Sequence, residues 1–198
     1  RDCLLSRGLG DVYKRQYVYN AYGVQGIYSA PGKAVKEAYD SSGVVTNDRG
    51  ITVWLKGNRV SRNQIMAIKE ESVTDQKNSL TVCLDNILRH AGITRNTEYD
   101  LAQGKTAIQI LEENMTGVQV LDLSGCSLDA VLYYVNQDIP VLAILEDGEA
   151  VLVTGFNEFN VVIMEPSTGK LYKKGMNDAT TWFAENGNHF ISYMKIEN

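Results

Sequence analysis

The chain has 198 residues, of which 44% are hydrophobic, and a formal net charge of −5, so it is long enough to bury one sizeable core. An acidic chain without a basic run offers no electrostatic footprint for nucleic acid or an anionic lipid surface, and we expect no nucleic-acid partner. No stretch reaches the roughly 18 apolar residues that a membrane span needs, so we expect no span in this chain.

Residues 1–16 read as a translated sequencing adaptor. Asp11-Val-Tyr-Lys-Arg-Gln16 is the translation of GAT GTG TAT AAG AGA CAG, the transposase end sequence of tagmentation libraries, and Cys3-Leu-Leu5 fits the opposite strand. We expect this segment to be an artefact of a metagenomic fragment, to be set aside like a fusion scar. It carries four basic and two acidic residues, so without it the formal charge is −7.

Residues 17–76 are expected to form a lead-in segment or the tail of a preceding domain. Pro31 is typical of a first helical position, and the helix-like stretch Lys33–Tyr39 follows it. The stretch Ile51–Leu55 is rich in β-branched and aromatic residues, which predicts a strand. Turn residues such as Gly50 separate these short elements.

Residues 77–198 carry the pattern of a folded domain that starts with three helices. The first has apolar residues at helical spacing between a predicted N-cap at Ser79 and a predicted stop at Gly92. Thr106 and Ser127 are the predicted N-caps of the second and third helices.

After the third helix the periodicity changes from helical to extended. Val141–Leu145 and Ala150–Thr154 are near-continuous apolar runs separated by a loop with Gly148, which predicts a hairpin because glycine tolerates positive φ. Further strands are expected at residues 161–164, 171–172 and 190–193, with a short helix from Asp178. Helices followed by strands predict an α+β fold.

These parts, in this order, resemble the bacteriocin-processing (double-glycine-leader) papain-like cysteine peptidases and their secreted relatives. The shared parts are a helix around Cys83, a hairpin strand in Gly148-Glu-Ala-Val-Leu-Val-Thr-Gly-Phe156, and Met164-Glu-Pro-Ser-Thr-Gly169. The resemblance covers about residues 70–195. It implies a papain-like cysteine peptidase fold in which N-terminal helices pack on a C-terminal antiparallel sheet.

The resemblance also implies roles for four candidate catalytic residues. Cys83 matches the nucleophile, Glu149 falls on the histidine position, and Glu165 falls on the aspartate that would orient that histidine. Gln76 matches, out of register by about one residue, the glutamine that helps to form the oxyanion hole. The glycine that follows the cysteine in the family is Leu84 here.

A glutamate at position 149 changes what such a site can do. A thiol needs a nearby base or cation to exist as thiolate at neutral pH, whereas the Glu149 carboxylate would repel the thiolate and raise the pKa of Cys83. His90 lies seven residues further along the helix, about 10 Å up its axis and beyond the roughly 3 Å of a catalytic pair. The distance of His189 is not fixed by the sequence. We therefore expect a catalytically degenerate site.

Three functions stay open on the sequence. The first is a pseudoenzyme that serves as a peptide-binding or accessory module of a larger bacterial protein, extracellular or at the cell surface, with a peptide or protein as its ligand. The alternative is an active thiol peptidase with Cys83 as nucleophile, and the third is a structural domain whose groove binds nothing. No Cys/His cluster has zinc spacing, so neither metal nor cofactor is expected. The two cysteines outside the adaptor, Cys83 and Cys126, are too few for a disulfide scaffold and leave the redox compartment open.

Overall fold

The computed structural model describes residues 15–57, 61–62, 64–65 and 68–196, and the chain divides into two compact units, residues 1–58 and 59–198. This division falls earlier in the chain than the boundary between residues 76 and 77 that we expected. Residues 1–14 of the expected adaptor lie outside the described residues, while Gln16 begins the first strand.

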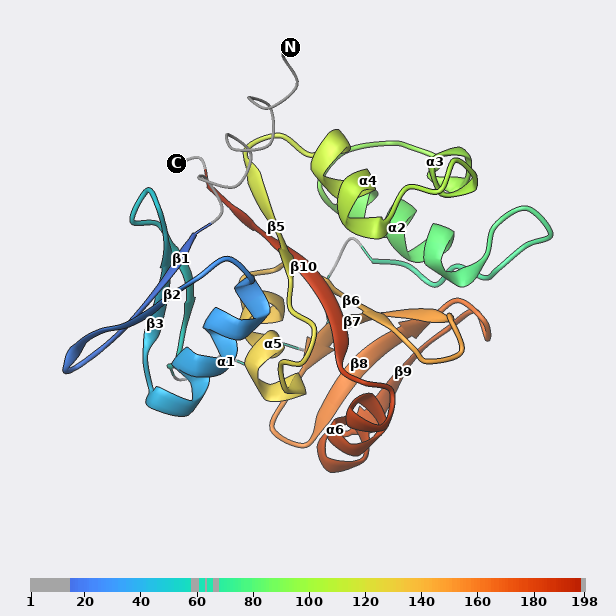
Figure 1. Cartoon of the computed structure of the whole chain (residues 1–198). Helices are drawn as coiled ribbons and strands as arrows, with labels where there is room; N and C mark the ends of the chain where they lie inside the picture. The colour runs from blue at the N-terminus through green and yellow to red at the C-terminus, as the bar shows by residue number, and fades with distance from the viewer. Residues whose placement is uncertain (1–14, 58–60, 63, 66–67, 197–198) are drawn as a thin grey trace, which may run out of the picture. The chain divides into compact units, whose positions relative to one another are not determined.

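The first unit is an antiparallel sheet with one helix, drawn in blue to cyan in Figure 1. Helix α1 (Pro31–Ser41) starts at its proline, as predicted, and contacts β1. The predicted strand at residues 51–55 is also confirmed as β4, whereas the three strands before it were missed. The sheet order is β2-β1-β3-β4, formed by Gln16–Asn20 (β1), Gly23–Tyr28 (β2), Val44–Asn47 (β3) and Thr52–Leu55 (β4).

The second unit is built on a six-stranded sheet of order β5-β10-β6-β7-β8-β9, in which all neighbours are antiparallel. All seven residues of β7 are buried, and because alternate residues of a strand point to opposite faces, both faces of the sheet are covered here. The strands are Val118–Asp122 (β5), Val141–Ile144 (β6), Ala150–Phe156 (β7), Asn160–Glu165 (β8), Lys170–Gly175 (β9) and His189–Lys195 (β10).

Helices pack onto this sheet from two groups, which Figure 1 separates by colour. The green group α2, α3 and α4 precedes all six strands of this sheet, and α2 contacts β7 and β6. Helix α5 contacts the same two strands as well as β10 and α6. The helices are Ser79–His90 (α2), Glu98–Ala102 (α3), Ala107–Asn114 (α4), Leu128–Asn136 (α5) and Met176–Glu185 (α6).

Most of the local predictions for this unit are confirmed, including the α+β class, the hairpin of β6 and β7, and the N-caps of α4 and α5. Two predictions are wrong. Asn78, not Ser79, caps α2, because the Asn78 side chain accepts a hydrogen bond from the Thr81 N–H at 2.8 Å. Strand β5 and the short helix α3 were missed, so the expected run of three helices is a run of four, interrupted by a strand that pairs with β10.

A short stretch before α2 also belongs to the second unit. Arg62 exchanges two backbone hydrogen bonds with Phe156, at 2.8 and 2.9 Å, and the Ile65 N–H donates to the Thr154 carbonyl at 2.6 Å. Ile65 and Ile68 are buried. This part of the expected lead-in segment therefore runs beside β7, is hydrogen-bonded to it, and contributes to the core of the second unit.

Candidate active site

The first turn of α2 is fixed against the first residue of β7. Ser79 is the first residue of the helix, is 2% exposed, and its Oγ accepts a hydrogen bond from the Ala150 N–H at 2.9 Å. This bond joins two segments that lie 71 positions apart in the chain. The helix start and the strand start that the sequence assigned to a catalytic pair are therefore neighbours in space.

A groove of about 570 Å³ lies at this junction. Its walls come from the turn before α2, the first residues of α2, the helix α3 and the residue before β7. Two of the four candidate residues, Gln76 and Glu149, line it, and Cys83 and Glu165 are not among its lining residues. The lining residues are Val73, Thr74, Asp75, Gln76, Lys77, Asn78, Ser79, Thr81, Glu98, Leu101, Ala102 and Glu149.

Cys83 lies one turn deeper in α2 than the groove. It is four residues beyond Ser79, about 6 Å along the helix axis, and has no exposed surface. Burial raises the pKa of the Cys83 thiol well above its usual value, and the charges of Glu149 and Glu71 raise it further. All three causes oppose the thiolate, so this thiol is held in its unreactive form.

Glu149 is exposed and stands directly before β7. Its N–H donates to Asp147 Oδ1 at 2.9 Å, and its carbonyl accepts the Leu145 N–H at 2.8 Å, which closes the hairpin loop. The side chain lines the groove, and its charge raises the pKa of Cys83. At this position it supplies negative charge where a thiol enzyme needs a cation.

Glu165 is engaged elsewhere, at the end of β8. Its carboxylate accepts hydrogen bonds from Thr168 Oγ1 at 2.7 Å and from the Tyr172 hydroxyl at 3.4 Å. Burial and the charge of Glu165 raise the pKa of Tyr172 to about 12, so that hydroxyl stays protonated and remains a donor. These contacts fold the turn between β8 and β9.

Gln76 is exposed in the turn between Thr74 and Lys77. Its backbone N–H donates to Thr74 Oγ1 at 3.3 Å. The residue also lines the groove. Gln76 is thus in the same groove as Glu149, while Cys83 is behind the wall.

A polar network next to the groove was missed by the sequence analysis. Lys77 Nζ donates to Asp85 Oδ2 at 2.6 Å, and the Asp85 side chain is 1% exposed. The other oxygen, Oδ1, accepts from the N–H and the Oγ1 of Thr97 at 2.9 and 3.0 Å. A buried aspartate needs such partners, and the acidic residue within the apolar face of α2 was the sequence signal that could have found it.

The remaining chemistry-bearing residues lie away from the groove. His90 is at the far end of α2, where its Nε2 contacts the Asp138 carbonyl at 2.6 Å, and His189 is exposed at the start of β10. Cys126 is buried before α5. Within the described ranges no group of three or more His, Cys, Asp or Glu side chains is arranged to hold a metal ion. None of the helices described is long and apolar enough to cross a membrane.

Comparison with known proteins points to a fold and not to a sequence family. No family model matches the chain, and no curated protein does. A crystal structure from Bacillus anthracis, of a protein provisionally assigned as a C39-like peptidase, matches with a TM-score of 0.57 at 16% identity. The match covers 72% of this chain and 100% of the other. At this identity the likeness shows that the two proteins share a fold, and it carries no residue roles.

Proposed function

We propose that the second unit is a catalytically degenerate member of the papain-like, bacteriocin-processing type of cysteine peptidase fold, which binds a peptide in the groove at the start of α2. It serves as a binding or accessory module of a larger bacterial protein, at the cell surface or outside the cell. The observation that carries the proposal is the position of Cys83, which is fully buried behind the groove beside two carboxylates that oppose its ionisation.

The residues that meet at the groove support this reading. Ser79 and Glu149 occupy the place where the start of α2 and the start of β7 come together. A serine hydroxyl ionises far less readily than a thiol, and an exposed glutamate is too weak a base to take its proton at neutral pH. Acyl transfer therefore lacks both an activated nucleophile and a matched base.

The charge of the groove indicates the kind of peptide that it favours. Asp75, Glu98 and Glu149 bring three carboxylates to its walls, and the single cation, Lys77, is paired with Asp85. The groove therefore attracts a peptide with basic side chains, with an attraction that weakens as salt increases.

The loss of catalysis is tested by alkylation of the intact chain with iodoacetamide across pH, followed by peptide mapping that separates Cys83 from Cys126. We expect Cys83 to stay unlabelled near pH 6 and to react only when the fold is opened by denaturant. Rapid labelling of Cys83 near pH 6, together with cleavage of peptide substrates, would instead establish an active thiol peptidase.

Binding is tested separately, with an array of short peptides that vary in charge. We expect basic peptides to bind and the Ala102→Arg variant to lose them, because Ala102 is an exposed groove residue at the end of α3 and the arginine adds both bulk and positive charge. Ala184→Arg, at an exposed alanine of α6, is the matched control. Equal binding by both variants would place the peptide outside the groove, and no binding by the unmodified chain would leave a structural domain without a ligand.

A further inference from the structure

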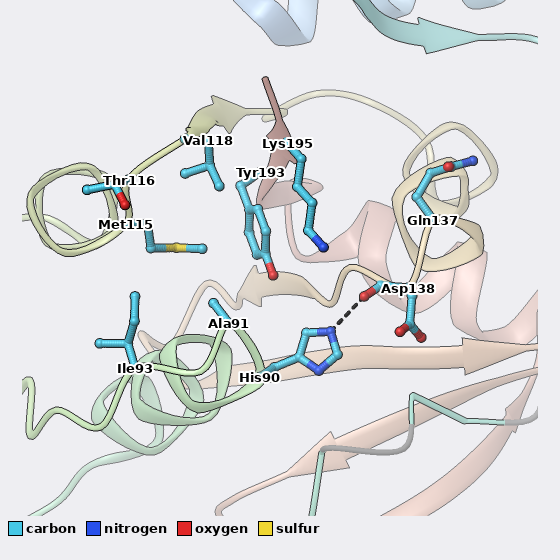
Figure 2. Close-up of a pocket in the computed structure, with 11 residues that line it drawn as sticks. His90, Ala91, Ile93, Met115, Thr116, Val118, Gln137, Asp138, Tyr193 and Lys195 are labelled. Atoms are coloured by element: carbon cyan, nitrogen blue, oxygen red, sulfur yellow. Dashed lines mark hydrogen bonds between the residues drawn. The ribbon is translucent and has the colours of Figure 1, made fainter. Parts of the chain in front are cut away.

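A second cavity, of about 480 Å³, lies at the opposite end of α2. Figure 2 shows it between the end of α2, the turn that leads into β5, the turn between α5 and β6, and the last residues of β10. Its volume falls in the range of sites for small molecules, roughly 300–1,000 Å³. None of the residues that line it lines the groove.

The hydroxyl of a largely buried tyrosine faces this cavity. Tyr193 is 3% exposed, and its side chain extends from β10 with the hydroxyl directed into the cavity (Figure 2). The hydroxyl has no hydrogen-bond partner among the described residues. Burial and the charge of Asp138 raise the pKa of Tyr193 to about 12, so the hydroxyl keeps its proton and is a donor. Buried polar groups in native proteins are nearly always bonded, to protein, water or ligand.

His90 adds a second buried polar atom to the same wall. Its Nε2 lies 2.6 Å from the Asp138 carbonyl, which can only accept, so Nε2 is the donor of this bond and Nδ1 takes no part in it. This Nδ1 is buried and has no partner within the described part of the chain. Because Nδ1 is buried and points away from Tyr193 and Lys195 in Figure 2, the Tyr193 hydroxyl is the unpartnered polar atom that faces the cavity.

The cavity also carries an unbalanced positive charge. Lys195 is two residues beyond Tyr193 on β10, hence on the same face of the strand, and Figure 2 shows its ammonium directed into the same space. Asp138, the acidic residue on the wall, pairs with Arg62 at 3.2 Å. No carboxylate of the described residues pairs with Lys195, so the donors favour an anion.

An apolar wall completes the site. Ile93, Met115 and Val118 line the side of the cavity next to Tyr193, as Figure 2 shows. Met115 is 6% exposed and fills space behind the other two. An anion that binds here therefore has an apolar body next to its charged group, because a bare inorganic anion would leave this wall uncovered.

We propose that this cavity binds a small aliphatic monocarboxylate. Its carboxylate accepts a hydrogen bond from the Tyr193 hydroxyl and pairs with the Lys195 ammonium, and its aliphatic part covers Ile93, Met115 and Val118. Such a group is found at the C-terminus of a peptide that ends in an aliphatic residue, and also in a short free carboxylic acid. The site is independent of the function proposed for the groove.

The test is calorimetric titration of the intact chain with N-acetyl-leucine, N-acetyl-leucinamide and hexanoate. We expect N-acetyl-leucine to bind at least roughly tenfold tighter than its amide, because the amide cannot pair with Lys195 and bonds less strongly to Tyr193. Tighter binding of N-acetyl-leucine than of hexanoate indicates a peptide C-terminus, and the reverse order a free acid; both outcomes support the carboxylate site.

Variants then assign the two donors. Tyr193→Phe removes only the hydroxyl and Lys195→Gln only the charge, and each is expected to weaken binding of the acid by roughly tenfold. Tyr99→Phe and Lys173→Gln, at exposed positions away from the cavity, are the matched controls. Equal affinity for acid and amide, no saturable binding of either acid, or full affinity in the Lys195→Gln variant overturns the proposal. Lys195 is exposed, so this variant keeps the fold and the result stays readable.

Discussion

The polar groups at the two ends of α2 differ in whether they have hydrogen-bond partners within the fold. At the start of the helix, Ser79 accepts a backbone N–H and Asp85 has three donors, so the polar atoms are satisfied within the fold. At its end, the Tyr193 hydroxyl faces a cavity and the Nδ1 of His90 is buried beside it, both without partners in the described chain. Polar groups of the first kind hold the structure together, whereas those of the second kind are available to a ligand.

The strongest challenge to this comparison is to place a thiol where Ser79 now stands. In the Ser79→Cys/Glu149→His variant the new thiol is at the N-terminus of α2, where the helix dipole and a neighbouring imidazolium both favour the thiolate. We expect the cysteine at position 79 to react with iodoacetamide near pH 6 at least about a hundredfold faster than Cys83 of the same molecule. Peptide mapping measures both rates.

Two single variants show which change produces this reactivity. Ser79→Cys alone keeps Glu149 and is expected to react slowly, because the carboxylate raises the pKa of the new thiol. Glu149→His alone is expected to leave Cys83 unlabelled, because burial is the first cause of its raised pKa. Fast labelling of Cys83 in the Glu149→His variant would contradict the conclusion that Cys83 is buried and does not line the groove.

The next largest effect is expected from Asp85→Ala, which removes the centre of the network at the start of α2. Lys77 and the two donors of Thr97 then lose their partner inside the fold. Lys77 is 26% exposed and can turn to water, but the buried N–H of Thr97 loses its charged acceptor, so we expect the free energy of unfolding to fall by about 3 kcal/mol. Urea denaturation measures this change, with the exposed Glu158→Ala as control. A loss as small as that of the control would mean that the network contributes no stability.

The sequence predicted the elements of the second unit better than the chemistry between them. Apolar periodicity found α2 and the hairpin of β6 and β7, because burial of one face or of a whole strand leaves a pattern in neighbouring residues. The contact of Ser79 with Ala150 leaves no such pattern, since the two residues are brought together only by packing.

The assignment of a site residue from a motif was limited for the same reason. Cys83 was chosen by its residue type and its place near the start of a predicted helix, but it is fully buried and lies two residues beyond Thr81, the last residue of α2 that lines the groove. Periodicity states which face of a helix is buried, and it does not state which turn borders a cavity. The second cavity was missed because Tyr193 and Lys195 look like ordinary strand residues.

A smaller loss is expected for Ser79→Ala. The Ala150 N–H is then buried without its acceptor, which costs about 2 kcal/mol of unfolding free energy. Thermal denaturation or urea titration measures it. Ser124→Ala, at an exposed serine before α5, controls for the change of residue type. An unchanged stability would show that the bond between α2 and β7 is dispensable.

The smallest change in stability is expected for Tyr193→Phe. The sign of the change in the free energy of unfolding shows whether the hydroxyl is bonded within the fold. The hydroxyl has no partner in the described chain, so its removal leaves the unfolding free energy unchanged or slightly higher at neutral pH, within about 1 kcal/mol. The pKa of Tyr193 is raised to about 12 in the folded protein from about 10 in the unfolded chain. The contribution of this shift to the free energy of unfolding is therefore fully present below about pH 10 and is lost as the pH rises to about 12. The variant should lose stability less steeply in that window. Tyr172, whose pKa is also about 12, and Cys83, Tyr133 and Tyr134, whose pKa values are raised by burial, contribute to the decline that remains. A clear destabilisation at neutral pH would mean that the hydroxyl is bonded within the fold, and the two ends of α2 would then be alike.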